Sequence, residues 1–200
     1  MSTRHVLLAL LSIKPMTGYE LAQNIKASVD SLWAATHSQI YPALHKLQEE
    51  QLVTSENHVR GQLMQRIVYT ITDAGIQEFE RWLNEPIQYL PFRDPFMLWA
   101  SYMEACPPEV VFRNIDEHIQ LCRQRAESLE RIAESILQDT HPLMQARKGR
   151  NSREQIERIR RSRSVVFMEL AARLRFEIAS AQRLRQVAAE LCGAEIAGHE

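Results

Sequence analysis

Apolar positions follow helical spacing in two successive stretches at the start of the chain. The first runs from Val6 to Ile13, is strongly apolar, and is stopped by Lys14-Pro15. The second begins with Thr17 and Glu20, which have the spacing of a capping box, in which each side chain satisfies the other residue's free backbone N–H. Its apolar positions are Leu21, Ile25 and Val29. This pattern predicts two short helices, each with one buried side.

The third stretch, residues 36 to 50, is apolar on one side only. Its apolar positions at helical spacing are Ile40, Ala43, Leu44 and Leu47. The side chains that then point away are Ser38, Gln39, Tyr41, His45 and Lys46. Amide and hydroxyl groups suit the edges of DNA bases, lysine suits phosphate, and tyrosine suits sugar or phosphate. This outer face is the candidate DNA-binding surface of a helix-turn-helix formed with the preceding helix.

The start of this third helix can be argued from Pro42. Thr36 and Gln39 also have capping-box spacing, but a helix that began there would enclose Pro42 and lose a backbone hydrogen bond. We therefore predict a start at 38 or 39, which places Pro42 at the edge of the first turn. Polar side chains then lie at the positively polarised end of the helix, where a phosphate is favoured.

A two-stranded wing is predicted next. Residues 53–59 and 67–71 read as two strands. The loop between them runs from Arg60 to Arg66, and arginines at both ends of a hairpin tip can reach phosphates or a minor groove. Thr72 then caps a closing helix that Pro86 ends. Residues 1–85 are therefore predicted to form a winged helix-turn-helix domain, long enough for one modest core.

Four ordered segments resemble the winged-helix domain of PadR-type transcriptional regulators. They are Pro15–Leu21, His37–Leu44, Leu52-Val53 and Tyr69–Gly75. The resemblance implies that the helix beginning near Ser38 binds DNA with the help of the wing. Two positions depart from the family pattern: His45 stands where Lys or Arg is frequent, and Gln51 stands where Gly is usual. Gln51 must then end its helix without the left-handed geometry that Gly adopts easily.

Longer helices are predicted after a linker at residues 86–93. Asp94-Pro95 marks a clean helix start. Apolar positions then step alternately by three and four residues, the spacing of a coiled-coil seam, at Phe112, Ile115, Ile119, Cys122, Ala126, Leu129, Ala133 and Ile136. A last helix starts at a third capping box, Ser152 with Gln155. Its apolar positions are Ile156, Ile159, Val166, Phe167, Leu170, Leu174, Ile178, Ala181, Leu184, Ala188 and Leu191.

Two long helices joined by a short connection are expected to pack antiparallel. The predicted fold class is mainly α: an N-terminal winged helix-turn-helix domain and, over residues 94–192, an antiparallel long-helix (coiled-coil) dimerisation domain. Two such hairpins, one from each subunit, are expected to form a four-helix or intertwined homodimer. The region from Arg93 to Leu191 also resembles the C-terminal domain of virulence-activator-like PadR members.

Composition narrows the class of protein. The 200 residues are 45% hydrophobic and 24% charged, which fits one or two globular domains. No apolar run of membrane-spanning length and no signal peptide are present, so we expect a soluble, cytoplasmic protein. Cys106, Cys122 and Cys192 form neither a zinc motif nor a disulfide framework and are expected to be reduced. Without a phosphate-binding Gly loop, a nucleophile motif or histidines paired at ligand spacing, we predict no enzyme, no metal and no cofactor.

The charge of the predicted DNA-binding domain is not favourable overall. The chain has a net charge of −1, and residues 1–85 contain seven Lys and Arg against nine Asp and Glu. A favourable field must then be local, from Arg4, Lys46, Arg60 and Arg66. We expect modest affinity for double-stranded DNA per domain, and hence a need for a dimer.

A second basic region spans residues 147–163, whose eight Lys and Arg against two Glu give a net charge of +6. Two interpretations are open. One is a solvated helix start paired with acidic residues of the preceding helix, such as Glu127, Glu130 and Glu134. The other is a further contact with DNA or with an acidic partner.

The interpretation that accounts for most of these features is a homodimeric, PadR-type transcriptional regulator that binds a pseudo-palindromic operator. Its recognition helices would enter successive major grooves about 34–36 Å apart. Two alternatives are open. The first is a sensor of the same fold that binds aromatic or multidrug ligands, with Trp33, Trp99 and Tyr102 as either cavity or core residues. The second is a winged-helix protein-interaction module that does not bind DNA.

Overall fold

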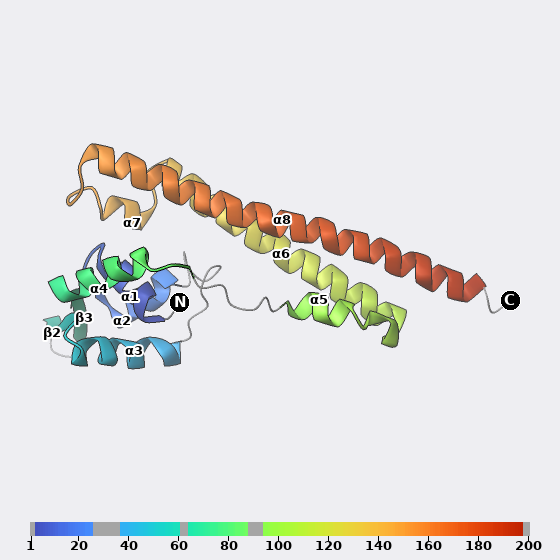
Figure 1. Cartoon of the computed structure of the whole chain (residues 1–200), viewed down its shortest axis with the longest axis horizontal. Helices are drawn as coiled ribbons and strands as arrows, with labels where there is room; N and C mark the ends of the chain where they lie inside the picture. The colour runs from blue at the N-terminus through green and yellow to red at the C-terminus, as the bar shows by residue number, and fades with distance from the viewer. Residues whose placement is uncertain (1–2, 26–36, 61–63, 88–93, 198–200) are drawn as a thin grey trace. The chain divides into compact units, whose positions relative to one another are not determined.

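The computed structural model describes residues 3–25, 37–60, 64–87 and 94–197. Val29 and Trp33 lie outside these residues, and the side chains of Ser38 and Arg60 are also outside the description. The chain forms two compact units, which we describe separately (Figure 1). The first comprises Met1–Gln88 with Pro142–Ile156, and the second comprises Tyr89–His141 with Glu157–Glu200.

The first unit is built from short helices around a small sheet. Its helices are α1 (Thr3–Leu11), α2 (Gly18–Asn24), α3 (His37–Glu49), α4 (Asp73–Asn84) and α7 (Pro142–Gln145), and its strands are β1 (Met16–Thr17), β2 (Val53–Arg60) and β3 (Met64–Ile71). The sheet is antiparallel, in the order β1-β3-β2. The predicted two-stranded wing was therefore incomplete, because Met16 and Thr17 add a third strand opposite Tyr69 and Val68.

The hairpin of the wing is longer than predicted. β2 reaches Arg60 and β3 begins at Met64, so the prediction of a loop from Arg60 to Arg66 is wrong. Arg66 lies in a strand, directly opposite His58. The cause is the register: once two antiparallel strands are aligned, backbone pairing continues residue by residue until the chain turns, whatever the polarity of the side chains.

The core of the first unit consists of the predicted apolar stripes. The buried apolar residues of its first three helices and the segments that follow α1 and α2 are Val6, Leu7, Leu8, Leu10, Leu11, Ile13, Met16, Leu21, Ala22, Ile25, Ile40, Leu44 and Leu47. The capping box of α2 is confirmed, since the backbone N–H of Glu20 donates to Thr17 Oγ1 (3.2 Å) and the N–H of Thr17 donates to Glu20 Oε2 (2.8 Å). Burial of these stripes fixes which sides of α1, α2 and α3 remain outside.

The segment between the two long helices belongs to this core as well. Leu143 of α7 is buried in the same apolar cluster, and Arg150 Nη1 donates a hydrogen bond to the carbonyl of Ile13 (2.9 Å). The predicted helical domain, residues 94–192, included Pro142–Ile156, which the structure places in the first unit.

α3 begins earlier than predicted. Its first residue is His37, so Pro42 lies inside the helix and the predicted start at 38 or 39 is wrong. Pro42 has no N–H to donate to the carbonyl one turn earlier, which removes one backbone hydrogen bond. Because Pro42 is exposed, water can reach that part of the helix, and the loss is tolerated.

The end of α3 contains a residue in the left-handed region. Gln51 has a φ of 59°. The N–H groups of Gln51 and Leu52 donate to the carbonyls of Gln48 (3.0 Å) and Leu47 (2.9 Å), which is a Schellman motif. Gln51 therefore adopts the geometry that favours glycine, at the cost of placing its Cβ close to the backbone.

The start of α4 packs directly on this end of α3. As predicted, Thr72 caps α4, because its Oγ1 accepts from the N–H of Gly75 (3.1 Å). The same hydroxyl donates to the carbonyl of Gln51 (2.8 Å). A Cβ on Gly75 would lie 2.2 Å from the carbonyl oxygen of Leu52, so only glycine permits this approach.

The second unit is dominated by two long helices. Its elements are α5 (Pro95–Ala100), the 3-10 helix η2 (Met103–Ala105), α6 (Pro108–Leu137) and α8 (Arg153–Ala197). The predicted antiparallel pairing of the long helices is confirmed (Figure 1). The predicted seam of α6 is buried except at Phe112, which is half-buried, and Val111 joins it. Among the described residues, no helix is long and apolar enough to cross a membrane.

α8 is apolar on two sides. Its buried inner residues include Phe167, Ala171, Ile178, Ala181 and Ala188. An outer stripe at helical spacing is exposed, and we define it as Val165, Met168, Ala172, Phe176, Val187 and Leu191. Of the apolar positions that the sequence analysis gave for this helix, Val166 and Leu191 are exposed. α8 does have a buried face, but Val166 and Leu191 do not lie on the side of the helix that packs against α6.

The basic region at 147–163 finds partners close by. Arg160 and Arg161 both pair with Glu157 (2.6 and 2.9 Å). Glu130, one of the acidic residues considered as a partner for this region, pairs with Arg175 (2.8 Å), which lies outside the region. The charge of the region is thus partly neutralised within α8 itself.

Candidate nucleic-acid interface

The outer face of α3 presents the predicted recognition residues to solvent. Its exposed side chains include Gln39, Tyr41, His45 and Lys46. They are exposed because the apolar residues on the opposite side of the helix are anchored in the core. Arg66 is exposed on β3. The structure therefore brings four of the predicted residues onto one helix and places Arg66 on the wing.

Tyr41 packs against the start of α2. A Cβ built on Gly18 would lie 2.7 Å from Cε1 of the Tyr41 ring and 3.2 Å from its hydroxyl oxygen. The ring thus lies directly against the first residue of α2, although 43% of Tyr41 is exposed. Backbone holds one side of the ring and solvent meets the other. This contact gives a physical reason for the glycine that follows the cap residue of α2.

Two hollows flank α3, each with a volume of about 470 Å³. The hollow toward the wing is lined by His45, Gln48, Glu49, Ser55, Asn57, Ile67 and Tyr69. The hollow toward the start of α1 is lined by Thr3, Arg4, Gln39, Pro42, Ala43, Lys46 and Leu47. His45 and Lys46 are neighbours in the sequence, yet they face opposite flanks of the helix. A ligand that contacts both must therefore span the outer face.

Arg4 does not contribute the free positive charge that we expected. Its guanidinium pairs with Glu50 (2.6 Å) and Glu78 (3.2 Å), and Arg81 also pairs with Glu78. Burial opposes the charged form, but Arg81 and Arg4 hold the pKa of the Glu78 carboxyl below its usual range. Arg4 therefore links α1 to α4 and to the end of α3.

Residues around the start of α2 were overlooked by sequence reasoning. The pKa of the Glu20 carboxyl lies below its usual range because the backbone and side chain of Thr17 donate hydrogen bonds to it, although burial acts in the opposite direction. The positive charges of Lys14 and Arg66 lower this pKa further. Lys14 and Arg66 thus act on the same carboxylate. Tyr19 is exposed, and its hydroxyl accepts a hydrogen bond from Gln23 Nε2 (2.6 Å). Tyr19 lies on α2 away from the apolar positions of that helix, so its exposure could have been predicted from the sequence.

The aromatic residues considered for a ligand cavity have different surroundings. Trp99 is half-buried in the apolar cluster of the second unit, with its ring centroid 5.9 Å from that of Phe96. Tyr102 is 65% exposed. Trp33 lies outside the described residues. Trp99 therefore fits the core interpretation, whereas Tyr102 lies neither in a core nor in an enclosed cavity.

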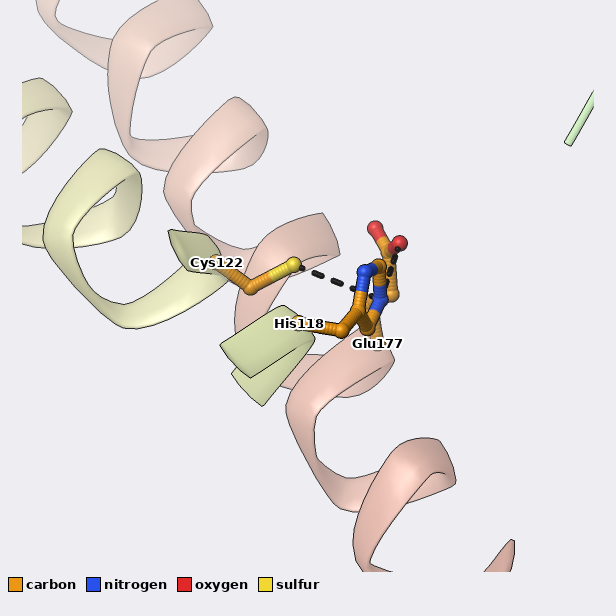
Figure 2. A group of neighbouring side chains, drawn as sticks. All are labelled: His118, Cys122 and Glu177. Carbon is orange, nitrogen blue, oxygen red and sulfur yellow. Dashed lines mark hydrogen bonds and ion pairs between the residues drawn. The ribbon is translucent and has the colours of Figure 1, made fainter. Parts of the chain in front are cut away.

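Three polar side chains of the second unit converge although the sequence analysis did not group them (Figure 2). His118 and Cys122 lie one turn apart on α6, and Glu177 reaches them from α8. His118 Nε2 lies 3.0 Å from Glu177 Oε1 and 3.6 Å from Cys122 Sγ. Burial, with the negative charge of Glu177, raises the pKa of the Cys122 thiol to about 11, so the free thiol is no nucleophile near neutral pH. The spacing of His118 and Cys122 on one helix face was a signal that was missed.

Comparison with known proteins relates both parts of the chain to characterised regulators. Residues 7–81 match the profile of the Transcriptional regulator PadR-like family. The negative transcriptional regulator PadR of Bacillus subtilis is 28% identical over 142 residues, which cover 70% of this chain and 78% of that protein.

Two solved structures share the fold over most of the chain. Bacillus subtilis PadR in complex with operator DNA has a TM-score of 0.71 at 21% identity, covering 92% of this chain and 98% of that chain. The Vibrio cholerae virulence activator AphA has a TM-score of 0.65 at 23% identity, covering 96% of this chain and 99% of that one. The predicted winged helix-turn-helix fold with long C-terminal helices is thereby confirmed.

Proposed function

The chain belongs to the PadR-like family of transcriptional regulators, and from this premise we propose that it binds a pseudo-palindromic operator as a homodimer, through the outer face of α3. Since the family consists of transcriptional regulators, the chain is not an enzyme. The solved complex of Bacillus subtilis PadR with operator DNA supports the choice of DNA as the partner.

The observation that carries this proposal is the position of Tyr41. Its ring lies against Gly18, and its other side is open, so a polar aromatic group is held in place on an exposed helix face. Holding a contact residue rigid reduces the entropy lost on binding. Ser38 and Gln39 join Tyr41 as the residues proposed to meet the groove or its edge.

We assign the phosphate contacts to the basic side chains around this face. Lys46 and His45 lie on its two flanks, and Arg66 is exposed on the wing. Arg60, on the neighbouring strand, is proposed for the same role. Each such contact adds affinity without sequence preference and makes binding weaker as salt rises. Because Arg4 is paired with two glutamates, its charge is not available to a phosphate, and a single domain is expected to bind weakly.

The outer stripe of α8 is proposed as the dimer interface. It is a row of exposed apolar side chains on a helix whose opposite side is already packed, interrupted by Arg183, whose guanidinium lies 5.9 Å from the Phe176 ring centroid. Exposed apolar side chains gathered on one face of a helix are normally covered. The Phe176 side chain at its centre is 70% exposed. A second copy, which presents the same stripe, is self-complementary to it about a two-fold axis.

The decisive variants are at Tyr41. The full-length protein is used to select binding sites from random DNA, and affinity for the selected site is then measured at one salt concentration. Tyr41→Ala is expected to lose about tenfold or more in affinity, whereas Tyr41→Phe keeps the ring and loses less. Tyr102→Ala, which removes an exposed tyrosine of the second unit, is the matched control. Unchanged binding by Tyr41→Ala would show that the face is assigned wrongly.

The same selection separates the two alternatives of function. If an intact dimer enriches no DNA sequence, the protein-interaction module becomes the better account. If DNA binding is present and an aromatic compound both quenches tryptophan fluorescence and releases the DNA, the chain is a ligand-responsive regulator.

A further inference from the structure

We propose that His118, Cys122 and Glu177 form a Zn²⁺ site that links α6 to α8. The three residues lie on elements that the proposed DNA contact does not use. The inference therefore stands or falls independently of DNA binding.

Two of the distances between the three donors are close to those of a tetrahedral zinc site. Their imidazole, sulfur and carboxylate atoms all lie within 4.8 Å of one another. Zinc bonds of about 2.0–2.3 Å place neighbouring ligand atoms roughly 3.3–3.8 Å apart in a tetrahedron. The 3.6 Å between Cys122 Sγ and His118 Nε2 already fits, and the 3.0 Å between His118 Nε2 and Glu177 Oε1 needs to open by only a few tenths of an ångström.

The chemistry of the donor set selects the metal. A thiolate and an imidazole are preferred by Zn²⁺, whereas Mg²⁺ and Ca²⁺ are bound almost entirely by oxygen. On binding, the Cys122 thiol gives its proton to solvent and its sulfur bonds to the ion, while neutral His118 binds through a ring nitrogen. The thiolate and the Glu177 carboxylate together carry two negative charges, which match the charge of the ion.

The surroundings orient the donors and leave one side open. The ring of Phe96, on α5, stacks on His118 with centroids 3.7 Å apart and planes 3° from parallel, which fixes the imidazole. Cys122 is 2% exposed, but 37% of the Glu177 side chain is exposed. Water can therefore supply a fourth ligand, and an ion can enter from that side. Asp94, the cap of α5, places a further negative charge near Cys122, whereas Arg125 places a positive charge there.

A purely structural ion pair is the competing explanation. Arg175 with Glu130 and Arg185 with Asp116 also join α8 to α6, and neither pair includes a metal ligand other than a carboxylate. The pair of His118 and Glu177 differs because a thiol is placed beside it. If the group were only a third bridge of this kind, it would not hold Zn²⁺ and the thiol would be incidental.

The test is a titration of the tag-free, reduced, full-length protein with Co²⁺, followed by displacement with Zn²⁺. Co²⁺ bound to a thiolate gives a charge-transfer absorption band, and tetrahedral coordination gives visible d–d bands. We expect one equivalent per chain, and Cys122→Ser should abolish the charge-transfer band. Cys106→Ser, which alters a half-buried thiol packed against the same apolar cluster, is the matched control and should leave the band unchanged.

A second variant keeps the test decisive if Cys122→Ser is poorly folded, as judged by circular dichroism. Glu177→Gln alters a partly exposed side chain and should weaken Zn²⁺ binding by about tenfold or more while the helices remain folded. The proposal is overturned if the wild-type protein gives no thiolate band, if the band is lost in Cys106→Ser instead, or if Glu177→Gln binds Zn²⁺ like the wild type.

Discussion

α3 and α8 have the same kind of inner face and opposite kinds of outer face. Each buries an apolar stripe in its own unit. Beyond that stripe, α3 presents polar and aromatic groups such as Tyr41, His45 and Lys46, whereas α8 presents the outer stripe centred on Phe176. Water can form hydrogen bonds with the polar side chains on the outer face of α3, but not with the apolar side chains of the outer stripe of α8. The comparison teaches that the outer face of α3 is suited to a polar ligand such as DNA, whereas the outer stripe of α8 is suited to an apolar protein surface, which we propose is a second copy of the chain.

The largest expected effect follows from charging the outer stripe of α8. Phe176→Glu places a carboxylate in the proposed dimer interface, and we expect dimer affinity to fall by at least about 100-fold. Sedimentation velocity over a range of concentrations measures this change, and operator affinity should fall with it. Gln182→Glu adds the same charge at an exposed position off the stripe and serves as the control. If Phe176→Glu still forms the dimer with unchanged affinity, the outer stripe of α8 is not the dimer interface, and the proposed difference in partner between α3 and α8 is contradicted.

The next effect concerns how the outer face of α3 is built. Gly18→Ala should push the Tyr41 ring from its place, because the added Cβ would lie 2.7 Å from it. The ring is partly exposed and can swing away, so we expect the melting temperature to change little and operator affinity to drop by about tenfold. Binding assays and thermal melts on the same preparation measure both. Full affinity in Gly18→Ala would show that the position of the ring does not matter.

Helix ends allow a smaller and purely energetic comparison of the two units. Gln51 after α3 and Asp139 after α6 both have a φ of 59°. Gln51→Gly should raise the free energy of unfolding by about 1 kcal/mol, since glycine adopts this geometry without strain. Asp139→Gly should gain less, because aspartate tolerates the left-handed region better than glutamine does. Urea denaturation of both variants checks the order, and an equal or reversed gain would contradict it.

The smallest effect is a dependence on pH that both units share. Burial lowers the pKa of His5 and of His141 below the ordinary value. The folded state therefore favours the neutral form of both rings. Their contribution to the free energy of unfolding is fully present above the unfolded pKa of about 6.5 and is lost as the pH falls below that value. His5→Gln should flatten this dependence, as measured by urea denaturation between about pH 7.5 and 5.5. An unchanged slope would show that His5 does not contribute.

The parts of this fold that follow from a repeating pattern could be predicted from sequence. The buried stripes of α1, α3 and α6 and the capping box of Thr17 depend on neighbours three or four residues away, so the local pattern determines them. β1 contains only two residues and has no period to detect. Pro42 does not mark the start of α3, because one missing hydrogen bond at an exposed site does not stop a helix.

The parts of the candidate sites that join distant segments could not be predicted. The contact of Gly18 with Tyr41 depends on how α2 crosses α3, and the meeting of Glu177 with His118 depends on the register of α8 against α6. The sequence analysis gave one set of apolar positions for α8 and left out Val165, Met168, Phe176 and Val187 of its outer stripe, because a helix pattern alone does not tell which residues a neighbouring helix covers. Packing between helices supplies this information.

Hydroxyl-radical footprinting of the full-length protein on DNA selected by it tests the central claim most directly. If two α3 helices read one site from a two-fold dimer, the footprint should show two protected stretches on one face of the duplex, centred about 34–36 Å apart or a multiple of that distance. A single protected stretch, or protection that does not depend on sequence, would contradict the account.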